Sequence, residues 1–234
     1  MQISNPDIGE IIDERGLYED LLPLDNARIL ELGCGTGLHT RNIARAGVGR
    51  RVTAYEVDEI QHAKNLNSDY PHNIKFKFGG AENIHEPDDT FDVAMLFKSL
   101  HHVPTPHMEQ ALQEISRVLK PGGLVYISEP IFAGEFNEVL RLFHDEQVVR
   151  RSAFDCVKDV VKRGLFSLEQ QTFFAAAVHF DDFADLDKKI IQATHTEHQL
   201  DEQTYRDVEL AFNQHMTAKG ANFRAPMRVD VLRK

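Results

Sequence analysis

Cysteine is scarce in this chain, and basic residues are outnumbered by acidic ones. Only two cysteines, Cys34 and Cys156, occur among the 234 residues. Two thiols are too few for a disulfide scaffold or a four-cysteine zinc site, and they fit a reduced, cytoplasmic setting. Lys and Arg number 26 against 37 Asp and Glu, which gives a formal net charge of −11. Because phosphate backbones attract clustered Lys and Arg, we expect no nucleic-acid partner.

Long apolar runs are also missing. No uninterrupted apolar stretch approaches the ~18 residues of a membrane-spanning helix. The first ten residues contain Asp7 and Glu10 but no basic cluster, so we expect neither a membrane span nor a secretory signal peptide. There is no low-complexity stretch and no internal repeat. At roughly 150 residues per domain, this length predicts either one large domain or one domain with an appended lobe.

Short apolar runs alternate with helical patterns in the first half of the chain. Strands are predicted at residues 27–32, 51–57, 74–78, 91–97 and 124–128. Helices are predicted at residues 40–46, 59–68 and 107–119. Gly47 follows the first of them and Pro121 the last, and both are residues that stop a helix. Strands and helices that alternate at this spacing indicate a parallel α/β sheet with right-handed crossovers.

The second half is less regular. Helical patterns cover residues 133–165, 183–194 and 202–219, and residues 225–232 are predicted to form a closing strand. The segment from Thr172 to Phe180 stays open, because its three consecutive alanines favour a helix while the flanking Phe and Val favour a strand.

A glycine-rich loop, Glu31–Gly37, follows the first predicted strand and opens a helix. Its alternate glycines allow a tight turn and bring backbone N–H groups against a ligand. The third glycine, Gly37, comes one position too early for the dinucleotide-binding pattern, and no Gly-Lys-Ser/Thr follows. Glu56 lies at the end of the next strand, 19 residues after Gly37, where a carboxylate suits the hydroxyls of a ribose.

Taken together, these blocks resemble class I S-adenosylmethionine-dependent methyltransferases of the small "type 11" kind. The resemblance covers about residues 25–130 and rests on four segments in order. They are Glu31–Gly37, Tyr55–Asp58, Gly80–Val103 and Arg117–Gly123. It implies S-adenosylmethionine as cofactor and S-adenosylhomocysteine as product.

The resemblance also implies an architecture. We expect a Rossmann-like, mostly parallel seven-stranded sheet with helices on both faces and an antiparallel last strand. Within one methyltransferase domain, we expect four segments. They are an N-terminal helical segment (1–24), a cofactor-binding core (25–130), a helical lid or insertion (131–222) and the terminal strand (223–234).

Cofactor contacts carry over to ten positions. These are Glu31, Gly33, Cys34, Gly35, Gly37, Glu56, Val57, Ala81, Glu82 and Phe97. Glu31 would sit near the methionine amino group, and Glu56 would accept both ribose hydroxyls. Val57 would pack on adenine, and Ala81 and Glu82 would contact its edge. Cys34 on its own reads as a small packed side chain in the loop.

Phe97 and Gly80 lie at the two ends of the cofactor site that the resemblance implies. Phe97 would stand at the end of the fourth strand, near the methionine part of the cofactor. Gly80 departs from the family pattern, since it stands where relatives often carry Asp to bind the adenine amino group. That bond must come from Glu82, come from water, or be missing.

Three residues are candidates for a general base. His101 and His102 follow the fourth strand, and Glu129 ends the fifth. Histidine suits the role because its unperturbed pKa lies near ~6.5. Each also has a structural interpretation, His102 as a wall of the pocket and Glu129 as a loop or capping residue. No His-x-x-x-His pair with an acid shares a helix, so we predict no metal.

The sequence leaves the acceptor open. The leading hypothesis is a methyltransferase that acts on a small molecule by in-line displacement. The alternatives are a methyltransferase for RNA or protein, or a non-catalytic S-adenosylmethionine-binding subunit. The oligomeric state also stays open, with a homodimer as one alternative. The negative net charge speaks against a basic groove for a large acceptor.

Overall fold

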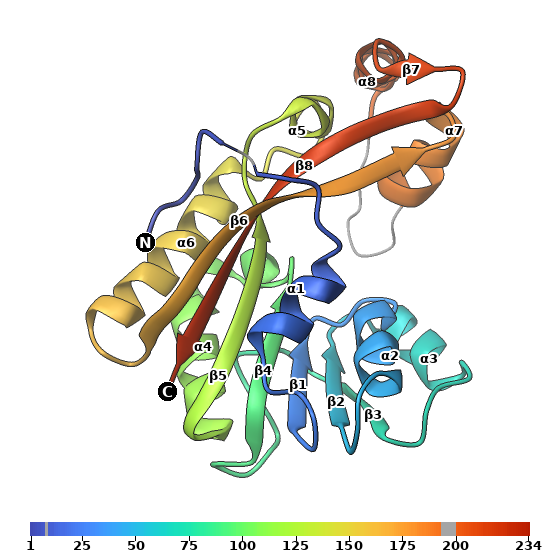
Figure 1. Cartoon of the computed structure of the whole chain (residues 1–234). Coiled ribbons are helices and arrows are strands. Elements are labelled where there is room, and N and C mark those ends of the chain that lie inside the picture. The colour runs from blue at the N-terminus through green and yellow to red at the C-terminus, as the bar shows by residue number, and fades with distance from the viewer. Residues whose placement is uncertain (8, 193–199) are drawn as a thin grey trace.

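Residues 1–7, 9–192 and 200–234 are described by the computed structural model, which folds around one central mixed sheet (Figure 1). Its strands are β1 (Arg28–Leu32), β2 (Arg51–Glu56), β3 (Ile74–Phe78), β4 (Phe91–Phe97), β5 (Leu119–Pro130), β6 (Ser167–Phe180), β7 (Met216–Thr217) and β8 (Gly220–Arg233). The strand order is β3-β2-β1-β4-β5-β8-β6, and the short β7 pairs with β8.

Strands β1 to β5 are parallel to their neighbours, as the predicted crossovers require. The last strand, β8, lies antiparallel between β5 and β6. The predicted fold class is therefore confirmed, including the antiparallel terminal strand. The observed strands β1 to β4 lie within the ranges predicted for them. The observed β5 includes its predicted range and is longer at both ends.

Helices cover both faces of the sheet. They are α1 (Glu14–Leu21), α2 (Leu38–Arg45), α3 (Glu59–Leu66), α4 (Met108–Val118), α5 (Glu135–Leu140), α6 (Gln147–Lys162), α7 (Phe183–Leu186) and α8 (Glu202–Asn213). Short 3-10 turns occur at Leu100–His102 and Thr105–His107, and a π turn at Asp187–Ile191.

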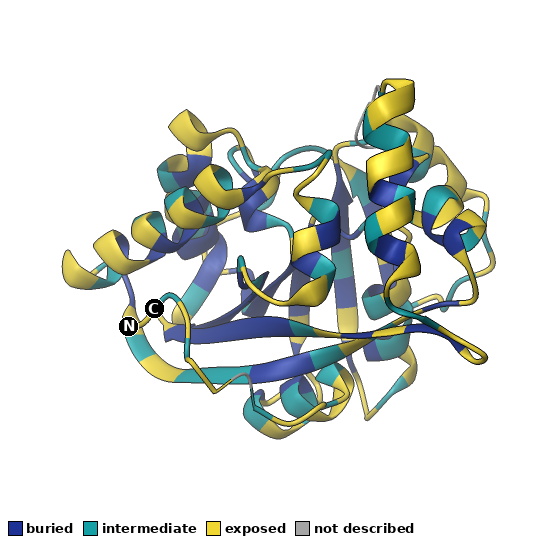
Figure 2. Cartoon of the chain, turned by 90° about the horizontal axis from the view of Figure 1, so that it is seen from above, coloured by how far each residue is buried: buried dark blue, intermediate teal, exposed yellow. Residues whose placement is uncertain are grey.

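Two apolar cores hold these layers together. On one face, Tyr18 of α1 and Ile43 of α2 pack against the sheet. On the other, Leu112 and Ile115 of α4 pack with Val157 of α6. In Figure 2 these helices are exposed on their outer sides and buried toward the strands, the pattern that apolar residues at a 3.6-residue period produce.

The segment Thr172–Phe180, for which the sequence favours neither helix nor strand, forms part of β6. The region 131–222, expected to be a helical lid or insertion, therefore contains a long strand as well as helices. The three alanines at 175–177 are paired with β8, and the N-terminal segment lies against them. Ala175 N donates to Glu10 O at 2.9 Å, and Ile12 N donates to Ala175 O at 3.0 Å. Small side chains fit where another backbone approaches this closely, and pairing with β8 outweighs the helix propensity of alanine.

The outer ends of β6 and β8 extend past the other strands and carry a third apolar cluster, which we call the distal lobe. Its core consists of Val139, Phe180, Phe183, Leu186, Ile191, Val208, Phe212, Ala221 and Phe223. The lobe combines α5, α7, α8 and the β7–β8 hairpin (Figure 1). The helix predicted at 202–219 ends at Asn213, because Met216–Thr217 form β7, which turns back into β8 at Gly220 with a φ of +80°. The helix predicted at 183–194 forms as far as Ile191, and its last two residues lie outside the described part.

No helix in the described residues combines the length and apolar character needed to cross a bilayer.

Candidate functional site

The glycine loop connects β1 to α2 at the carboxyl end of the sheet. Gly33, Gly35 and Gly37 have φ angles of +69°, +51° and +71°, a region that favours glycine. A Cβ at Gly33 would lie 2.6 Å from Cβ of Ser99, in the segment after β4. Gly35 has no heavy atom within 4 Å of the same position. Gly33 therefore permits close packing against the β4 end, while the loop at Gly35 is open on its outer side.

Glu31, at the end of β1, is the most deeply buried carboxyl group beside this loop, with 1% of the residue exposed. Thr40 of α2 donates its hydroxyl to Glu31 Oε2 at 2.6 Å. Burial raises the pKa of Glu31 to about 8, with Glu56 adding to the effect. A buried acid of this kind gains most from a cationic partner, which would favour its ionised form.

Glu56, at the end of β2, joins the loop to the second strand. Its carboxylate accepts the N–H of Gly35 at 2.6 Å and those of Val57 and Asp58 at 2.9 Å each. A carboxylate has about four acceptor positions, so these bonds leave capacity for a ligand hydroxyl. Glu56 thus lies where a ribose would need it, against the backbone of the glycine loop.

In the segment after β3, the Glu82 side chain lies beside Gly80. A Cβ at Gly80 would collide with both carboxylate oxygens of Glu82. The Glu82 carboxylate therefore occupies the space that an Asp side chain at position 80 would fill. Ala81 beside it is buried, and Val57 is 60% exposed at the β2 end.

Aromatic rings close the inner end of the site. The rings of His39 and Phe97 are stacked, with centroids 4.0 Å apart and planes 6° apart. Tyr18 meets Phe97 edge-on at 5.7 Å, and Tyr126 lies 5.5 Å from Phe97. Burial, with Lys98 nearby, lowers the pKa of His39 to about 4, so the ring is neutral at pH 7.

Two polar atoms in this aromatic group lack a hydrogen-bond partner among the described residues. They are the Tyr18 hydroxyl and Nδ1 of His39, and both are buried. Buried polar atoms are usually hydrogen-bonded, and a bound ligand is one way to satisfy them. Together with the open side of Gly35 and the buried Glu31, they fit a polar, partly cationic cofactor such as S-adenosylmethionine.

Helix α1 brings a further acid to the same region. The Tyr126 hydroxyl donates to Glu14 Oε1 at 3.3 Å. Burial raises the pKa of Glu14, although Ser128 and Lys98 oppose the shift. The sequence did not single out Glu14, Tyr18 or His39 as site residues. The position of His39, two residues after the last loop glycine, was the one available indication.

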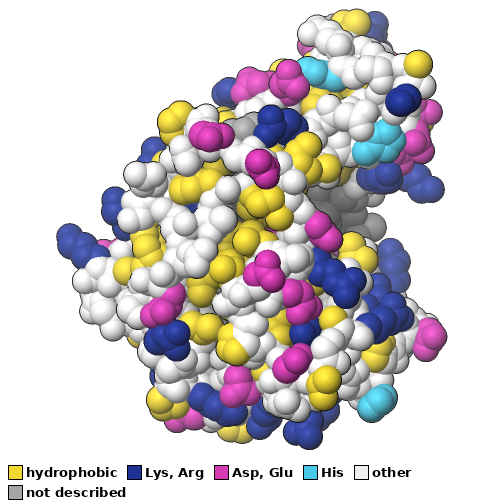
Figure 3. Space-filling model, viewed as in Figure 1, with side chains coloured by type: hydrophobic (Ala, Val, Ile, Leu, Met, Phe, Trp, Pro, Cys, Tyr) yellow, Lys and Arg dark blue, Asp and Glu magenta, His cyan; other side chains and the backbone are white. Residues whose placement is uncertain are grey.

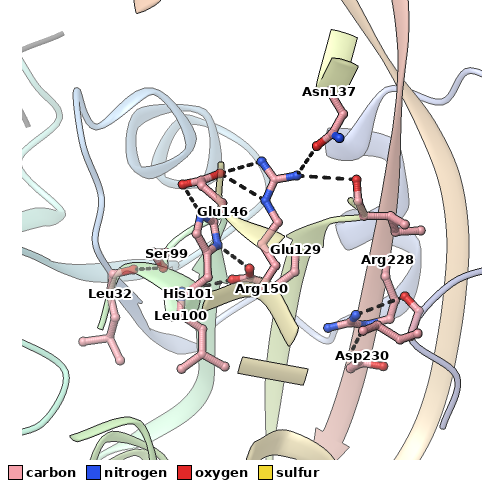
Figure 4. A network of polar contacts seen from close by, with 12 residues as sticks. Leu32, Ser99, Leu100, His101, Glu129, Asn137, Glu146, Arg150, Arg228 and Asp230 are labelled. Carbon is pink, nitrogen blue, oxygen red and sulfur yellow. Dashed lines mark hydrogen bonds and ion pairs between the residues drawn. The ribbon is translucent and has the colours of Figure 1, made fainter. Parts of the chain in front are cut away.

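The candidate bases His101 and Glu129 face each other on the α6 side of the sheet (Figure 4). His101 Nδ1 is hydrogen-bonded to Glu129, whose other oxygen accepts the N–H of Leu100 at 3.0 Å. Burial alone would lower the pKa of His101, but Glu129 and Glu146 raise it to about 9. Near neutral pH the ring is therefore protonated and has no lone pair with which to accept a proton. This environment does not favour His101 as a base.

His102 lies next to this pair but is exposed. The 3-10 turn Leu100–His102 places its ring 4.1 Å from that of His101, measured between centroids. Its role as a base stays a prediction. Glu146, just before α6, belongs to the same group and was not expected from the sequence, because only the packing of α6 against this turn brings it there.

Comparisons with known proteins point to the same class of domain. Residues 29–123 match the family model described as a methyltransferase domain. The match lies within the part of the chain whose motifs resemble class I S-adenosylmethionine-dependent methyltransferases, and that resemblance is confirmed.

Curated relatives match part of the chain. A ubiquinone biosynthesis O-methyltransferase of Maricaulis maris is 35% identical over 118 residues, which are 49% of this chain and 44% of the relative. A sterol 24-C-methyltransferase of Gibberella zeae is 27% identical over 169 residues, or 69% of this chain and 42% of the relative. The chain thus spans less than half the length of these relatives.

Solved structures match nearly the whole chain and show the fold. A SAM-dependent methyltransferase of Methanosarcina mazei has a TM-score of 0.58 at 15% identity, covering 93% of this chain and 96% of its own. The [4+2]-cyclase SpnF has a TM-score of 0.61 at 20% identity, covering 94% and 78% respectively. Since one neighbour is described as a cyclase, the shared fold does not by itself fix the reaction.

Proposed function

We propose that this chain is an S-adenosylmethionine-dependent methyltransferase that acts on a small-molecule acceptor. The observation that carries the proposal is the buried Glu31 beside the glycine loop. Glu31 is 1% exposed and forms no ion pair with any residue that the structure describes, and the cofactor's amino group would provide one. The methyltransferase-domain match over residues 29–123 supports the same assignment.

The residues of the chain would bind and orient the cofactor rather than react with it. S-adenosylmethionine supplies an electrophilic methyl group attached to a sulfonium sulfur. Glu31 would hold its ammonium group, and Glu56 its ribose hydroxyls. The stacked rings of His39 and Phe97 would form an aromatic wall that excludes water near the sulfonium.

A small acceptor is supported by charge and by the relatives. On the face shown in Figure 3, acidic and basic side chains are mixed over most of the surface, and several basic side chains lie together on the right, below the distal lobe. The net charge of −11 disfavours an RNA acceptor. The curated relatives are named for ubiquinone biosynthesis and for sterol methylation.

Isothermal titration calorimetry with S-adenosylmethionine and S-adenosylhomocysteine tests the cofactor assignment. We expect both to bind, and we expect Glu31→Gln to weaken binding by roughly 10–100-fold, the value of a hydrogen bond to a charged group. Glu138→Gln on α5 is the control, because Glu138 is exposed and distant in sequence from the loop. If neither compound binds the unaltered chain, the proposed function is wrong.

A further inference from the structure

Three side chains of types that can bind a metal ion lie together between the end of β4 and the start of α6. His101, His102 and Glu146 each offer one donor atom, and these atoms all lie within 4.8 Å of one another. His101 and Glu146 are buried, and His102 is exposed. His144 adds a third imidazole, with its Nε2 2.8 Å from Glu146 Oε1. Figure 4 shows His101 and Glu146 pointing toward each other from the β4 end and the start of α6.

The orientation of His101 is typical of a metal ligand. Its Nδ1 is hydrogen-bonded to Glu129, which fixes the ring and directs Nε2 toward Glu146. Metal-bound histidines commonly have their second nitrogen held by a carboxylate in this way. His101 Nε2 lies 3.5 Å from Glu146 Oε1, which is long for a hydrogen bond. It is close to ~3.4 Å, the ligand-to-ligand edge of a tetrahedron with metal–nitrogen distances of about 2.1 Å.

Glu146 is oriented in a complementary way. Arg150, one turn along α6, donates Nη2 and Nε to Glu146 Oε2 at 2.5 and 3.0 Å. Arg150 is itself held by Asn137 Oδ1 at 3.1 Å. The guanidinium therefore occupies one carboxylate oxygen, and Oε1 faces the histidines. A carboxylate presented through one oxygen beside two imidazoles is a common ligand set of zinc and related ions.

We propose that His101 Nε2, a ring nitrogen of His102 and Glu146 Oε1 bind one divalent transition-metal ion of the zinc type. Because His102 is exposed, the fourth position would be open to water or to a ligand, as in catalytic zinc sites. The absence of a metal was predicted from the lack of a His-x-x-x-His helix. Here the ligands come from separate elements, which that pattern does not detect.

The chemistry of the group explains both states of the protein. Without an ion, the two ring nitrogens of His101 face different carboxylates, Nδ1 that of Glu129 and Nε2 that of Glu146. A divalent ion would bind Nε2 through its lone pair, and any proton on Nε2 would be released to water while the Nδ1 proton stays on the hydrogen bond to Glu129. In that state His102 would serve as a metal ligand and not as the general base predicted from the sequence. The proposal does not depend on methyl transfer, because metal binding is measurable without cofactor or acceptor.

The test uses the full chain, stripped of metal with a chelator and dialysed. We expect calorimetry to show one Zn²⁺ bound per chain. Co²⁺ should bind with the same stoichiometry and give the visible absorption of an ion with nitrogen and oxygen ligands. His102→Ala should weaken Zn²⁺ binding at least tenfold, and its exposed position should leave folding intact. Glu129→Gln should weaken it by about 10–100-fold through the orientation of His101.

His107→Ala is the matched control, because His107 is also exposed, lies in the next 3-10 turn and is outside the group. It should bind Zn²⁺ as the unaltered chain does. The proposal is overturned if no stoichiometric Zn²⁺ binds. It is equally overturned if His102→Ala and His107→Ala bind Zn²⁺ alike, because binding would then reflect surface histidines. Circular dichroism of each variant confirms that a loss of binding is not a loss of fold.

Discussion

A buried acid makes the stability of this protein depend on pH. Glu31 has a pKa of about 8 in the folded chain, against about 4.5 when unfolded. Between these values the unfolded chain is ionised at this group while the folded chain keeps its proton. The folded state therefore binds more protons, and its stability falls as the pH rises from about 4.5 to 8.

Glu31→Gln should remove this contribution while keeping an acceptor for the Thr40 hydroxyl. At pH 5 we expect the variant and the unaltered chain to have similar free energies of unfolding. At pH 8.5 the variant should be more stable by at least about 1.4 kcal/mol, the free energy of one pKa unit. Urea unfolding followed by circular dichroism at both pH values measures the difference. Glu138→Gln should show no such change, and a constant offset for Glu31→Gln at both pH values would contradict the argument.

Glu82 provides a second prediction at this scale. Its carboxylate fills the space beside Gly80 where relatives often carry Asp. Glu82→Ala should weaken S-adenosylhomocysteine binding by about tenfold, the value of roughly one hydrogen bond to a charged group. Adding Gly80→Asp should restore most of that loss, because the first change frees the space for the new side chain. Calorimetry of the single and double variants is the measurement. No recovery in the double variant would show that the carboxylate does not act from this position.

At the scale of elements, the strands and helices that could be predicted are those that depend on the local sequence pattern. Strands β1 to β4 and helices α2 to α4 follow from apolar spacing and from glycine and proline stops. For Thr172–Phe180 of β6 the local pattern is ambiguous, because the alanines favour a helix while the flanking Phe and Val favour a strand. What decides it is pairing with β8 along its whole length and the N-terminal segment laid against Ala175. Both are contacts between distant parts of the chain.

Strand β8 carries a buried ion pair that joins several elements. Arg228 Nε donates to Asp230 Oδ2 at 2.8 Å, and both residues are at most 2% exposed. The Arg228 guanidinium also lies 4.7 Å from the ring centre of Phe154 in α6. Gln171 of β6 donates to the other oxygen of Asp230 at 2.6 Å. The pair therefore connects β8 with β6 and α6.

Asp230→Asn should destabilise the fold strongly, because it leaves the charge of Arg228 buried without its partner. We expect a loss of about 3–5 kcal/mol in the free energy of unfolding, measured by urea denaturation. Glu169→Gln is the control, since its ion pair with Arg233 is 39–44% exposed and should contribute less than about 1 kcal/mol. Similar losses of unfolding free energy in both variants would show that burial does not increase the contribution of the Arg228 ion pair to stability.

For the whole molecule, the predictable part of the site lies where strands end. Glu31, the glycine loop and Glu56 follow directly from strands β1 and β2, and the parallel sheet brings those ends together. Tyr18 and Glu146 reach the site only because α1 and α6 fold back over the same edge. No local pattern encodes such a packing choice, so these residues became visible only in the structure.

The distal lobe should be separable from the cofactor site in stability. Phe212 of α8 is fully buried there, with its ring 5.7–6.1 Å from those of Phe180, Phe183 and Phe223. Phe212→Ala removes a large side chain from a small cluster, at a cost of about 3–5 kcal/mol. Because that cluster is distinct from the cores beneath the sheet, we expect the cost to appear as local opening.

Hydrogen exchange and calorimetry together measure this separation. In the Phe212→Ala variant, amides of α8 and of the outer end of β8 should exchange at least tenfold faster, while those of β1 and β4 remain protected. Binding of S-adenosylhomocysteine should change by less than about twofold. If affinity for that compound falls along with protection in the lobe, the lobe and the cofactor site form one cooperative unit. If it does not, residues of the lobe can vary to suit an acceptor without loss of the cofactor, since the glycine loop and β1 pack with the two cores on the faces of the sheet.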